Sequence, residues 1–471
     1  MRSNNWDIWL SRFGLGLIIC YCVIASVFYS YFAQLHLTLK FVSVPIFVSE
    51  IILFVCLLIF ISVVIKDRFF SRRTIFLLCF YFAWLSVKIL IDYHNDGNLT
   101  FRNAALFYYP IFAVFTYCFY QKARIHFKDL MPLAYLSATI LFLKIMVVWY
   151  WWTYATLFVI AVLNTSSVKL RWLGCGFLAG ILLLGKEYLY EGPRAHFVSV
   201  FGAVLFMVIY FVFLLVKRRE IIRMRILLIG FVFFILGCLF FAEHNTVSSV
   251  SSIRTMIKTF NFFDERYQAK QKAFVPVKLE THLYNHKRFK DLFVANKELN
   301  GNGILHNIVN DKVKESRPLD LDENNIVFRL FVWRDMAREL IENKAWWGFS
   351  LGHPQRSRTL EVLNWASGEW GRDGWIAPHN SFFHIIYRSG ILGVLLIGVF
   401  LYMLIKLIMD FYRMCSIEGG LLVGALLYWL ELSNFFVILE FPYNAILFWS
   451  LFGITMAFRD GLKMENLRKK V

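Results

Sequence analysis

The sequence predicts an all-α polytopic membrane protein with about twelve transmembrane helices and one large, mainly helical extracytoplasmic loop. The 471 residues are 59% hydrophobic and only 17% charged, with a mean hydropathy of +0.57, whereas a soluble domain carries about 25% charged residues. Apolar runs long enough to cross a bilayer recur along most of the chain. Basic residues gather in the short loops between these runs, so membrane topology explains the net charge of +18 better than nucleic-acid binding does.

Nine candidate spans precede a long polar stretch, since a span needs about 20 apolar residues. They cover approximately residues 8–33, 42–65, 74–92, 103–121, 131–148, 150–164, 169–187, 195–217 and 224–243. Three more follow at about 384–408, 418–439 and 443–458. The predicted organisation is therefore transmembrane helices 1–9 in residues 1–243, a loop domain in 244–383, helices 10–12 in 384–458, and a tail in 459–471.

The positive-inside rule fixes the predicted orientation. With the N-terminus in the cytoplasm, clusters such as residues 66–73 and 217–225 fall in cytoplasmic loops, whereas the short outer loops hold few cations. This asymmetry favours two spans within residues 131–164. It places the 244–383 loop in the periplasm and the 459–471 tail in the cytoplasm. None of the eight cysteines lies in the polar segment, so a disulfide-stapled exterior domain is not expected.

His379, Asn380 and Ser381 stand directly before an apolar run and carry the strongest chemical signal. Asn and Ser are favoured N-cap residues, so we expect His379 where the chain enters a helix from the outer surface. A helix N-terminus attracts anions and disfavours a protonated imidazole, which would leave the histidine neutral and able to act as a base. Gly390 and Gly393 follow on one helix face, where they would allow close helix contact. The alternative is a capped helix with an incidental histidine.

Arg194 follows Gly192 and Pro193 and directly precedes the span at 195–217. Proline fits the first turn of a helix that runs inward, so Arg194 would be a cation at the outer face beside a second helix N-terminus. Together with His379, it would form a cradle for a diphosphate. The alternative is an interfacial arginine whose charge reaches the lipid headgroups.

Arg329, Trp333 and Arg334 lie in a segment with helical periodicity, about 328–347, which Gly348 and Gly352 interrupt. Arg329 and Trp333 are one turn apart and share a helix face. Arginine can hold phosphate with two hydrogen bonds, and tryptophan can stack on a sugar or a lipid. The alternative is an amphipathic helix that lies on the membrane surface.

Acidic and intramembrane charges give weaker signals. Asp320 and Asp322 form a DxD pattern in an acidic patch, which we interpret as solvated surface. Glu369 and Asp373 precede His379 and are possible second bases. Ionisable residues inside apolar runs are functional candidates unless they pair with one another. The three such residues are Lys88, Lys144 and Glu431.

The segment from His379 to Gly393 resembles the signature of the O-antigen ligase and polymerase superfamily. That signature is a histidine followed by Asn, Ser or Gln, nine residues, and Gly-x-x-Gly. Here His379-Asn380, the nine residues 381–389, and Gly390-x-x-Gly393 match it in full. Arg194 after its Gly-Pro turn and Arg329-x-x-x-Trp333 look similar to further family elements, although Pro193 departs from the usual Gly-Ser-Arg-Gly. The resemblance covers about residues 190–396.

The resemblance implies a metal-independent, cofactor-free inverting glycosyltransferase of the bacterial inner membrane. It would move a glycan from an undecaprenyl-diphosphate carrier to lipid A-core, another glycan or a protein at the periplasmic face. Arg194 and Arg329 would hold the donor diphosphate, and His379 would position or deprotonate the attacking hydroxyl. The implied supporting residues are Asn380, Trp333, Arg334, Gly390 and Gly393.

Other functions remain open at this stage. A polymerase of the same superfamily shares the signature and is not separated from a ligase. A polysaccharide-lipid flippase would need a charged path through the membrane, and the chain shows no internal repeat typical of a transporter. A carboxylate-based membrane glycosyltransferase would carry acidic residues in its first exterior loop, and residues 34–40 contain none. A scaffold role would not explain the His379–Gly393 signature.

Overall fold

The computed structural model describes residues 5–33, 35–38, 45–67, 70–97, 99–125, 129, 153–160, 194–219, 321–359 and 378–468. The chain divides into a larger unit (Met1–Gly237, Glu339–Pro354 and Ala377–Val471) and a smaller unit (Cys238–Arg338 and Gln355–Ile376). The structure is mostly helical with five apolar candidate spans, so the predicted class of an all-α membrane protein is confirmed. The count of twelve spans stays a prediction.

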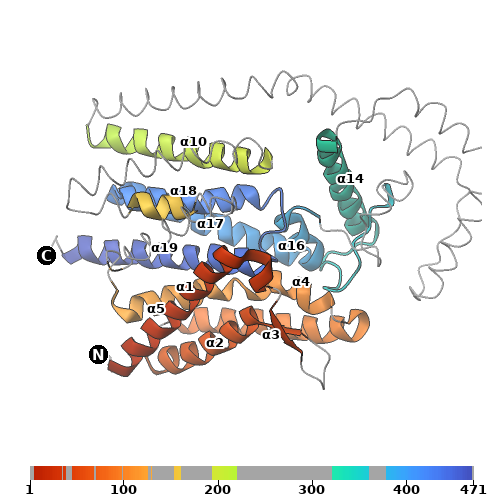
Figure 1. Ribbon diagram of the computed structural model, residues 1–471, viewed down its shortest axis with the longest axis horizontal. Coiled ribbons are helices and arrows are strands. Elements are labelled where there is room, and N and C mark those ends of the chain that lie inside the picture. The colour runs from red at the N-terminus through yellow and green to blue at the C-terminus, as the bar shows by residue number, and fades with distance from the viewer. Residues whose placement is uncertain are drawn as a thin grey trace, which may run out of the picture. The chain divides into compact units, whose positions relative to one another are not determined.

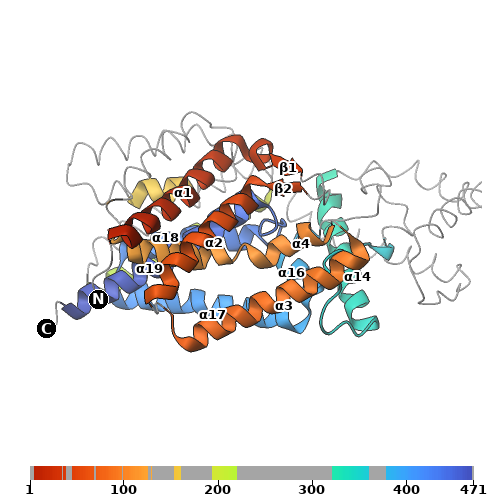
Figure 2. The same ribbon diagram turned by 90° about the horizontal axis from the view of Figure 1, so that it is seen from below.

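The helices of the larger unit run roughly along one direction (Figure 1). They are α1 (Asn5–Ala33), α2 (Val48–Asp67), α3 (Arg72–Asp96), α4 (Leu99–Tyr108), α5 (Ile111–Ala123), α10 (Arg194–Lys217), α16 (Ser381–Ser389), α17 (Ile391–Met414), α18 (Ile417–Leu432) and α19 (Pro442–Arg468). The boundary between the units falls within α14 (Leu321–Glu342). Strands β1 (His36–Thr38) and β2 (Pro45–Phe47) form an antiparallel hairpin between α1 and α2 (Figure 2).

Five described helices are long and apolar enough to cross a membrane. They comprise Asn5–Phe28 of α1, all of α3, Val198–Lys217 of α10, all of α17 and all of α19, with mean hydropathies from 1.3 to 2.7. The predicted spans at 131–148, 169–187 and 224–243 lie outside the described residues, and only residues 153–160 of the span at 150–164 are described.

Three predicted spans differ from the observed elements. Residues 103–121 form two helices, because Pro110 cannot donate a backbone hydrogen bond and the chain turns at Tyr109–Pro110. Residues 384–408 are divided at Gly390 into α16 and α17, for reasons given below. The segment 418–439 is helical only to Leu432, after which an irregular loop leads into α19.

Contacts at one end of the larger unit show how the helices are directed. Arg12 at the start of α1 donates to the carbonyl of Ala123 at the end of α5 (3.3 Å). Further contacts there join Tyr117 to Asp460 (2.9 Å), Lys463 to Asp410 (2.6 Å), and Lys217 to the carbonyl of Tyr412 (3.1 Å). We call this the basic end. The helices α10, α17 and α19 all finish here, so they run parallel and begin at the opposite end.

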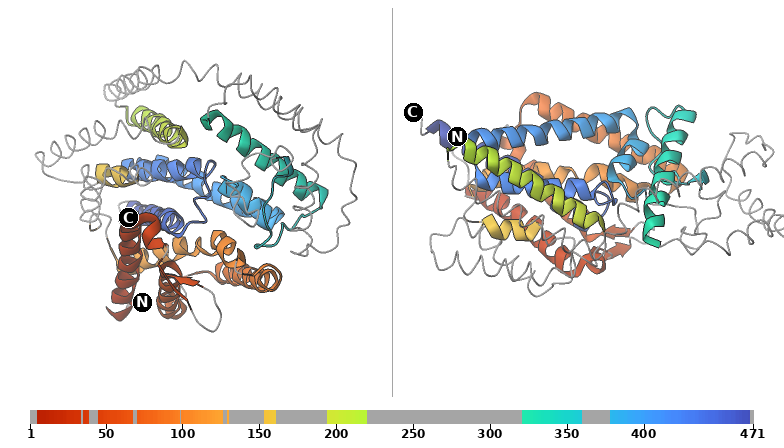
Figure 3. Two further views of the ribbon diagram at one scale, coloured as in Figure 1. Left: turned by 45° about the vertical axis from the view of Figure 1, so that its right-hand side comes forward. Right: turned by 90° about the horizontal axis from the view of Figure 1, so that it is seen from above.

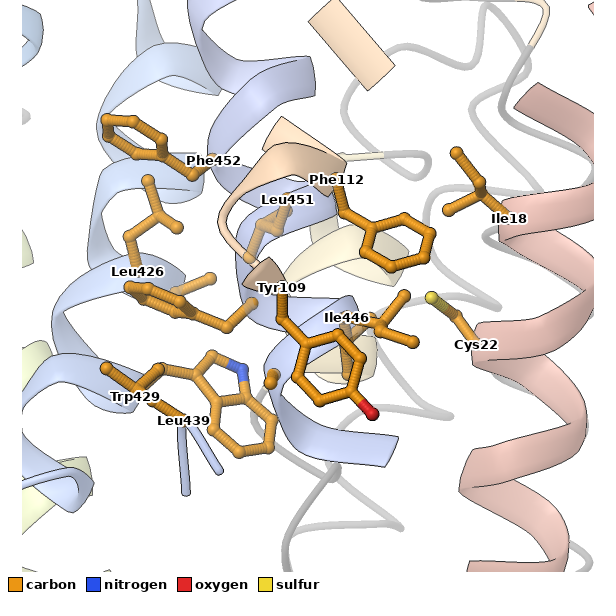
Figure 4. Close-up of a cluster of buried hydrophobic side chains, with 14 of the residues drawn as sticks. Ile18, Cys22, Tyr109, Phe112, Leu426, Trp429, Leu439, Ile446, Leu451 and Phe452 are labelled. Carbon is orange, nitrogen blue, oxygen red and sulfur yellow. The ribbon is translucent and has the colours of Figure 1, made fainter. Parts of the chain in front are cut away.

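The core of the larger unit is built where α1, α5, α18 and α19 meet (Figure 4). Aromatic side chains fill it, including Tyr109, Phe112 and Trp429, all at most 2% exposed. The indole of Trp429 donates to Thr153 (2.6 Å), so its one polar atom is satisfied. α10 lies along α18 on the other side of this core (Figure 3). These contacts fix the helix ends that carry the candidate site.

Candidate active site

The N-terminus of α16 is capped by Asn380, as the sequence predicts. The Asn380 side-chain oxygen accepts hydrogen bonds from the backbone N–H groups of Phe382 (2.9 Å) and Phe383 (3.0 Å). His379, one residue earlier, is partly exposed and has φ = 50°. A residue with a Cβ rarely adopts positive φ, and such strained residues cluster at functional sites where the surroundings hold them. The cap therefore fixes both the helix start and the direction in which the chain presents His379.

The loop between α18 and α19 holds this cap in place. The N–H of Ser381 donates to the carbonyl of Ser433 (2.8 Å), and its hydroxyl donates to the carbonyl of Phe436 (3.0 Å). The side-chain amide of Asn380 donates to the carbonyl of Asn434 (3.1 Å). Asn380 and Ser381 are buried. The position of His379 is thus determined jointly by α16 and by the end of α18.

Gly390 ends α16 and begins α17, which corrects the prediction that Gly390 and Gly393 lie on one face of a continuous helix. Its φ of 56° and ψ of −131° are open only to glycine, and an added Cβ would overlap the carbonyl oxygen of Trp346. That oxygen instead accepts a hydrogen bond from Ile391 N–H (2.8 Å). Gly348, with φ = 76°, approaches the same break from the other side, because a Cβ there would overlap the backbone of Arg388 and Ser389.

Gly393 serves the same break from within α17. A Cβ at Gly393 would lie 2.5 Å from the hydroxyl of Ser389, which donates to the carbonyl of Ile385 (2.7 Å). The two signature glycines therefore allow the backbones of α16, α17 and the 346–348 turn to meet. This is a contact between a helix break and a loop, and not the helix–helix contact that the sequence suggested.

Sequence reasoning missed a buried charge network beneath the cap. Arg388 is fully buried, and its guanidinium donates to the carbonyls of Ser350 (2.6 Å) and His353 (2.7 Å) and to Nε2 of His384 (3.2 Å). Because Nε2 accepts, the ring proton of neutral His384 is on Nδ1, which lies 3.3 Å from the Glu440 carboxylate. The four-residue spacing of His384 and Arg388 on a short helix was the available signal.

Glu440 lies just before α19 and joins two cations to this network. Its other oxygen accepts from Nε of Arg102 on α4 (3.2 Å). Burial alone would raise the pKa of Glu440, but its contact with His384 and the nearby guanidinium groups of Arg102 and Arg388 lower it below the ordinary value. Glu440 is therefore ionised, and it ties α16, α4 and the start of α19 together.

Lys88, a predicted intramembrane candidate, has partners in the structure. Its ammonium group donates to the carbonyl of Phe349 (3.1 Å) and lies 3.5 Å from the carboxylate of Asp92. Asp92 in turn accepts from the N–H of Leu351 (2.7 Å), and the hydroxyl of Ser350 donates to Asp96. These contacts dock the 346–354 segment on α3 and favour a structural role for Lys88.

Arg194 is the first residue of α10. At the other end of this helix, Lys217 donates to the carbonyls of Tyr412 and Arg413, and Arg218 donates to the carbonyl of Cys415 (2.6 Å). α10 and α17 each contain 24 residues and finish together, so their N-termini lie at the same end of the larger unit. The N-termini of α10 and α16, which carry partial positive charge, thus lie opposite the basic end of the larger unit.

The smaller unit carries Arg329, Trp333 and Arg334 on α14, as the helical periodicity predicts. Arg334 stabilises this unit, since its guanidinium donates to Thr359 (2.9 Å), lies 3.7 Å from Asp335, and covers the ring of Phe331. Partial burial of the Arg329 guanidinium lowers its pKa from the ordinary value.

Asp335 was not singled out by the sequence. Its buried carboxylate accepts three hydrogen bonds, from the hydroxyl of Ser357 (2.5 Å) and from the N–H and hydroxyl of Thr359 (both 2.8 Å). It therefore fastens the 355–359 segment to α14. Several predicted residues lie outside the described residues, namely Lys144, Pro193, Asp320, Glu369 and Asp373.

Comparison with protein families shows what this arrangement resembles. A family model described as O-antigen ligase matches residues 194–398, from the first residue of α10 into α17. The match confirms the resemblance seen in the sequence and supports placing the chain in the O-antigen ligase superfamily. It indicates a multi-pass bacterial membrane enzyme of the ligase and polymerase type, with lipid-linked glycan substrates. No curated protein matches the chain in a sequence search.

Proposed function

Since residues 194–398 match the O-antigen ligase family, we propose that the protein is a metal-independent inverting glycosyltransferase. It takes a glycan from an undecaprenyl-diphosphate carrier and attaches it to a hydroxyl of an acceptor at the periplasmic face of the bacterial inner membrane. Ligation of O-antigen to lipid A-core is the favoured reaction.

The observation that carries this proposal is the common direction of α10 and α16–α17. Arg194 begins one helix and His379 precedes the other, and both helix starts lie away from the basic end. The basic end faces the cytoplasm by the positive-inside rule, so the proposed site faces the periplasm. A diphosphate at this end would meet helix N-termini, which favour the charge of the leaving group.

The proposed reaction divides the work between two kinds of residue. Arg194 and Arg329 hold the diphosphate and stabilise its charge as the bond to the anomeric carbon breaks. His379 accepts the proton of the acceptor hydroxyl, whose oxygen forms the new glycosidic bond on the opposite face of the sugar. The hydrogen bonds of Asn380 and Ser381 to the loop after α18 hold the backbone next to His379, which supports a fixed starting position for its side chain.

The remaining residues of the family pattern support this site. Gly390 and Gly393 allow the helix break that carries the cap. Arg334 joins the helix that carries Arg329 and Trp333 to the 355–359 segment through its hydrogen bond with Thr359. Trp333 is one turn from Arg329 on α14, and we assign it to a face of the sugar or to the lipid carrier.

The test is the replacement of His379, Arg194 or Arg329 by Ala in the native host, with surface glycans separated on a gel. His94→Ala is the matched control, because His94 is an exposed histidine in the last turn of α3. A ligase predicts that long glycan on lipid A-core vanishes while lipid-linked polymer accumulates, with protein levels unchanged. Single repeat units on the core would instead identify a polymerase. An unchanged glycan profile in all three variants would refute the transferase and favour transport.

A further inference from the structure

Glu431 on α18 has a buried carboxylate oxygen, and the proposed reaction gives this residue no role. Glu431 is the next-to-last residue of α18, which ends at Leu432, and the other acidic residue of this helix, Glu418, lies in its first turn. Among the residues that the structure describes, its carboxylate has no hydrogen-bond or ion-pair partner, and its Oε2 is buried. A carboxyl group without a partner in an apolar surrounding is costly, so a chain keeps one where function needs it.

Gly202 on α10 makes the space that this carboxylate fills. A Cβ at Gly202 would overlap both carboxylate oxygens and the carboxyl carbon of Glu431. Any other residue at 202 would therefore push the carboxylate away from α10. The helix pair α10–α18 is packed closely at other places too, for example where Gly424 meets Met207 and Gly420 meets Tyr210. Of these three glycine contacts between α10 and α18, the one at Gly202 involves an acidic group.

Two connections place Glu431 between the elements of the proposed site. Gly202 is eight residues after Arg194 on the same helix, so the carboxylate contacts α10 about two turns from its N-terminus. The carbonyl of Ser433, two residues after Glu431, accepts a hydrogen bond from the N–H of Ser381. This bond helps to hold the Asn380 cap, which directly follows His379. The end of α18 therefore contacts both the helix of Arg194 and the cap of His379, and Glu431 is its acidic residue.

We infer that Glu431 is a substrate-binding residue of the transferase, whose carboxylate accepts hydrogen bonds from sugar hydroxyls beside the transferred bond. This inference rests on the proposed function. A carboxylate repels a diphosphate, so Glu431 serves the glycan and not the phosphate side of the donor. Sugar hydroxyls are abundant donors, and a carboxylate without a partner binds them strongly in an apolar surrounding.

The experiment compares four variants of the full-length protein, purified in lipid nanodiscs, with donor lipid and lipid A-core extracted from the native host. Glu431→Gln keeps the shape and removes the charge. Gly202→Ala keeps the charge and displaces the carboxylate. Gly424→Ala is the control for packing, because its Cβ would lie 2.8 Å from the flexible side chain of Met207 at the same helix pair. His379→Ala controls for the proposed function itself.

The measurements are the thermal midpoint of unfolding and the KM for each substrate. We expect Glu431→Gln and Gly202→Ala to raise KM for one substrate by about tenfold to a hundredfold, because this is the effect of losing one hydrogen bond to a charged group. The substrate affected tells whether the hydroxyls belong to the acceptor or to the donor glycan. Gly424→Ala is expected to leave both KM values near those of the wild type. Glu431→Gln is expected to unfold at or above the wild-type temperature, because it replaces an unpartnered, partly buried carboxyl group.

Unchanged KM values in Glu431→Gln, with His379→Ala inactive, would overturn this inference and leave the proposed function standing. A lowered midpoint with equal loss toward both substrates would assign Glu431 a structural role and would also overturn it. Full activity of His379→Ala, or no transfer by the wild type, would instead overturn the proposed function and the role of Glu431 with it.

Discussion

Replacing Gly390 with Ala tests whether the break between α16 and α17 is required. The backbone there (φ = 56°, ψ = −131°) is one that residues with a Cβ avoid, at a cost of about 1–3 kcal/mol. The new methyl group would also overlap the Trp346 carbonyl and separate it from Ile391 N–H, now 2.8 Å away. A hydrogen bond lost in this way costs about 0.5–1.5 kcal/mol. The expected loss of stability is therefore about 1.5–4.5 kcal/mol.

Gly398→Ala provides the matched control on the same helix. Gly398 lies in α17, and an added Cβ there would meet nothing within 4 Å. Alanine in a helix interior is more favourable than glycine by about 0.5–1 kcal/mol, so this variant is expected to be as stable as the wild type or slightly more so. Both substitutions add one methyl group, so their difference isolates the geometry of the break.

The assay is thermal unfolding of the purified full chain in detergent, together with glycan transfer in the native host. Gly390→Ala is expected to unfold several degrees below the wild type and to lose transfer, while Gly398→Ala retains both. If Gly390→Ala unfolded with Gly398→Ala and still transferred glycan, the backbone contact with Trp346 would not hold the site, and the argument would be wrong.

Two further predictions follow from the cap and from the buried network. Asn380→Ala removes the cap of α16 and is expected to cost about 0.5–2 kcal/mol, with faster hydrogen exchange at the amides of Phe382 and Phe383. Asn380→Asp keeps the acceptor for these amides but loses the donor to Asn434, so it is expected to retain more protection than Asn380→Ala and less than the wild type. Glu440 has a pKa below the ordinary glutamate value, so its stabilising effect is complete above about pH 4.3 and disappears as the pH falls through its lower folded pKa. The thermal midpoint of the wild type should fall across that window more steeply than that of Glu440→Gln, and parallel curves would contradict the ionic role of Glu440.

Local signals in the sequence were sufficient for the parts of the site that depend on neighbouring residues. The cap by Asn380 was predictable because an N-cap bonds to N–H groups two and three residues later. The helix of Arg329 and Trp333 was predictable from its periodicity. The start of α10 at Arg194 was predictable from the proline at position 193 of the sequence, because proline is favoured at the beginning of a helix.

Features that depend on distant residues were not predictable in the same way. Glu440 meets His384, 56 positions earlier, and Arg102, 338 positions earlier, and no spacing rule connects them. The signature glycines were interpreted as a helix contact because the turn at Trp346, which Gly390 meets, lies far away in sequence. The division at Pro110 was different, since the proline itself was a visible signal inside an apolar run.

The two terminal helices have a consequence for counting the membrane crossings. α1 begins and α19 finishes at the same end of the larger unit, because each is joined there to the C-terminal part of α5, by Arg12 and by Asp460. A chain that enters and leaves on one side of a bilayer must cross it an even number of times. For a protein embedded in a membrane, the stretch from the start of α1 to the end of α19 is therefore expected to cross the bilayer an even number of times, and reporters placed beside Asn5 and Arg468 are expected in one compartment.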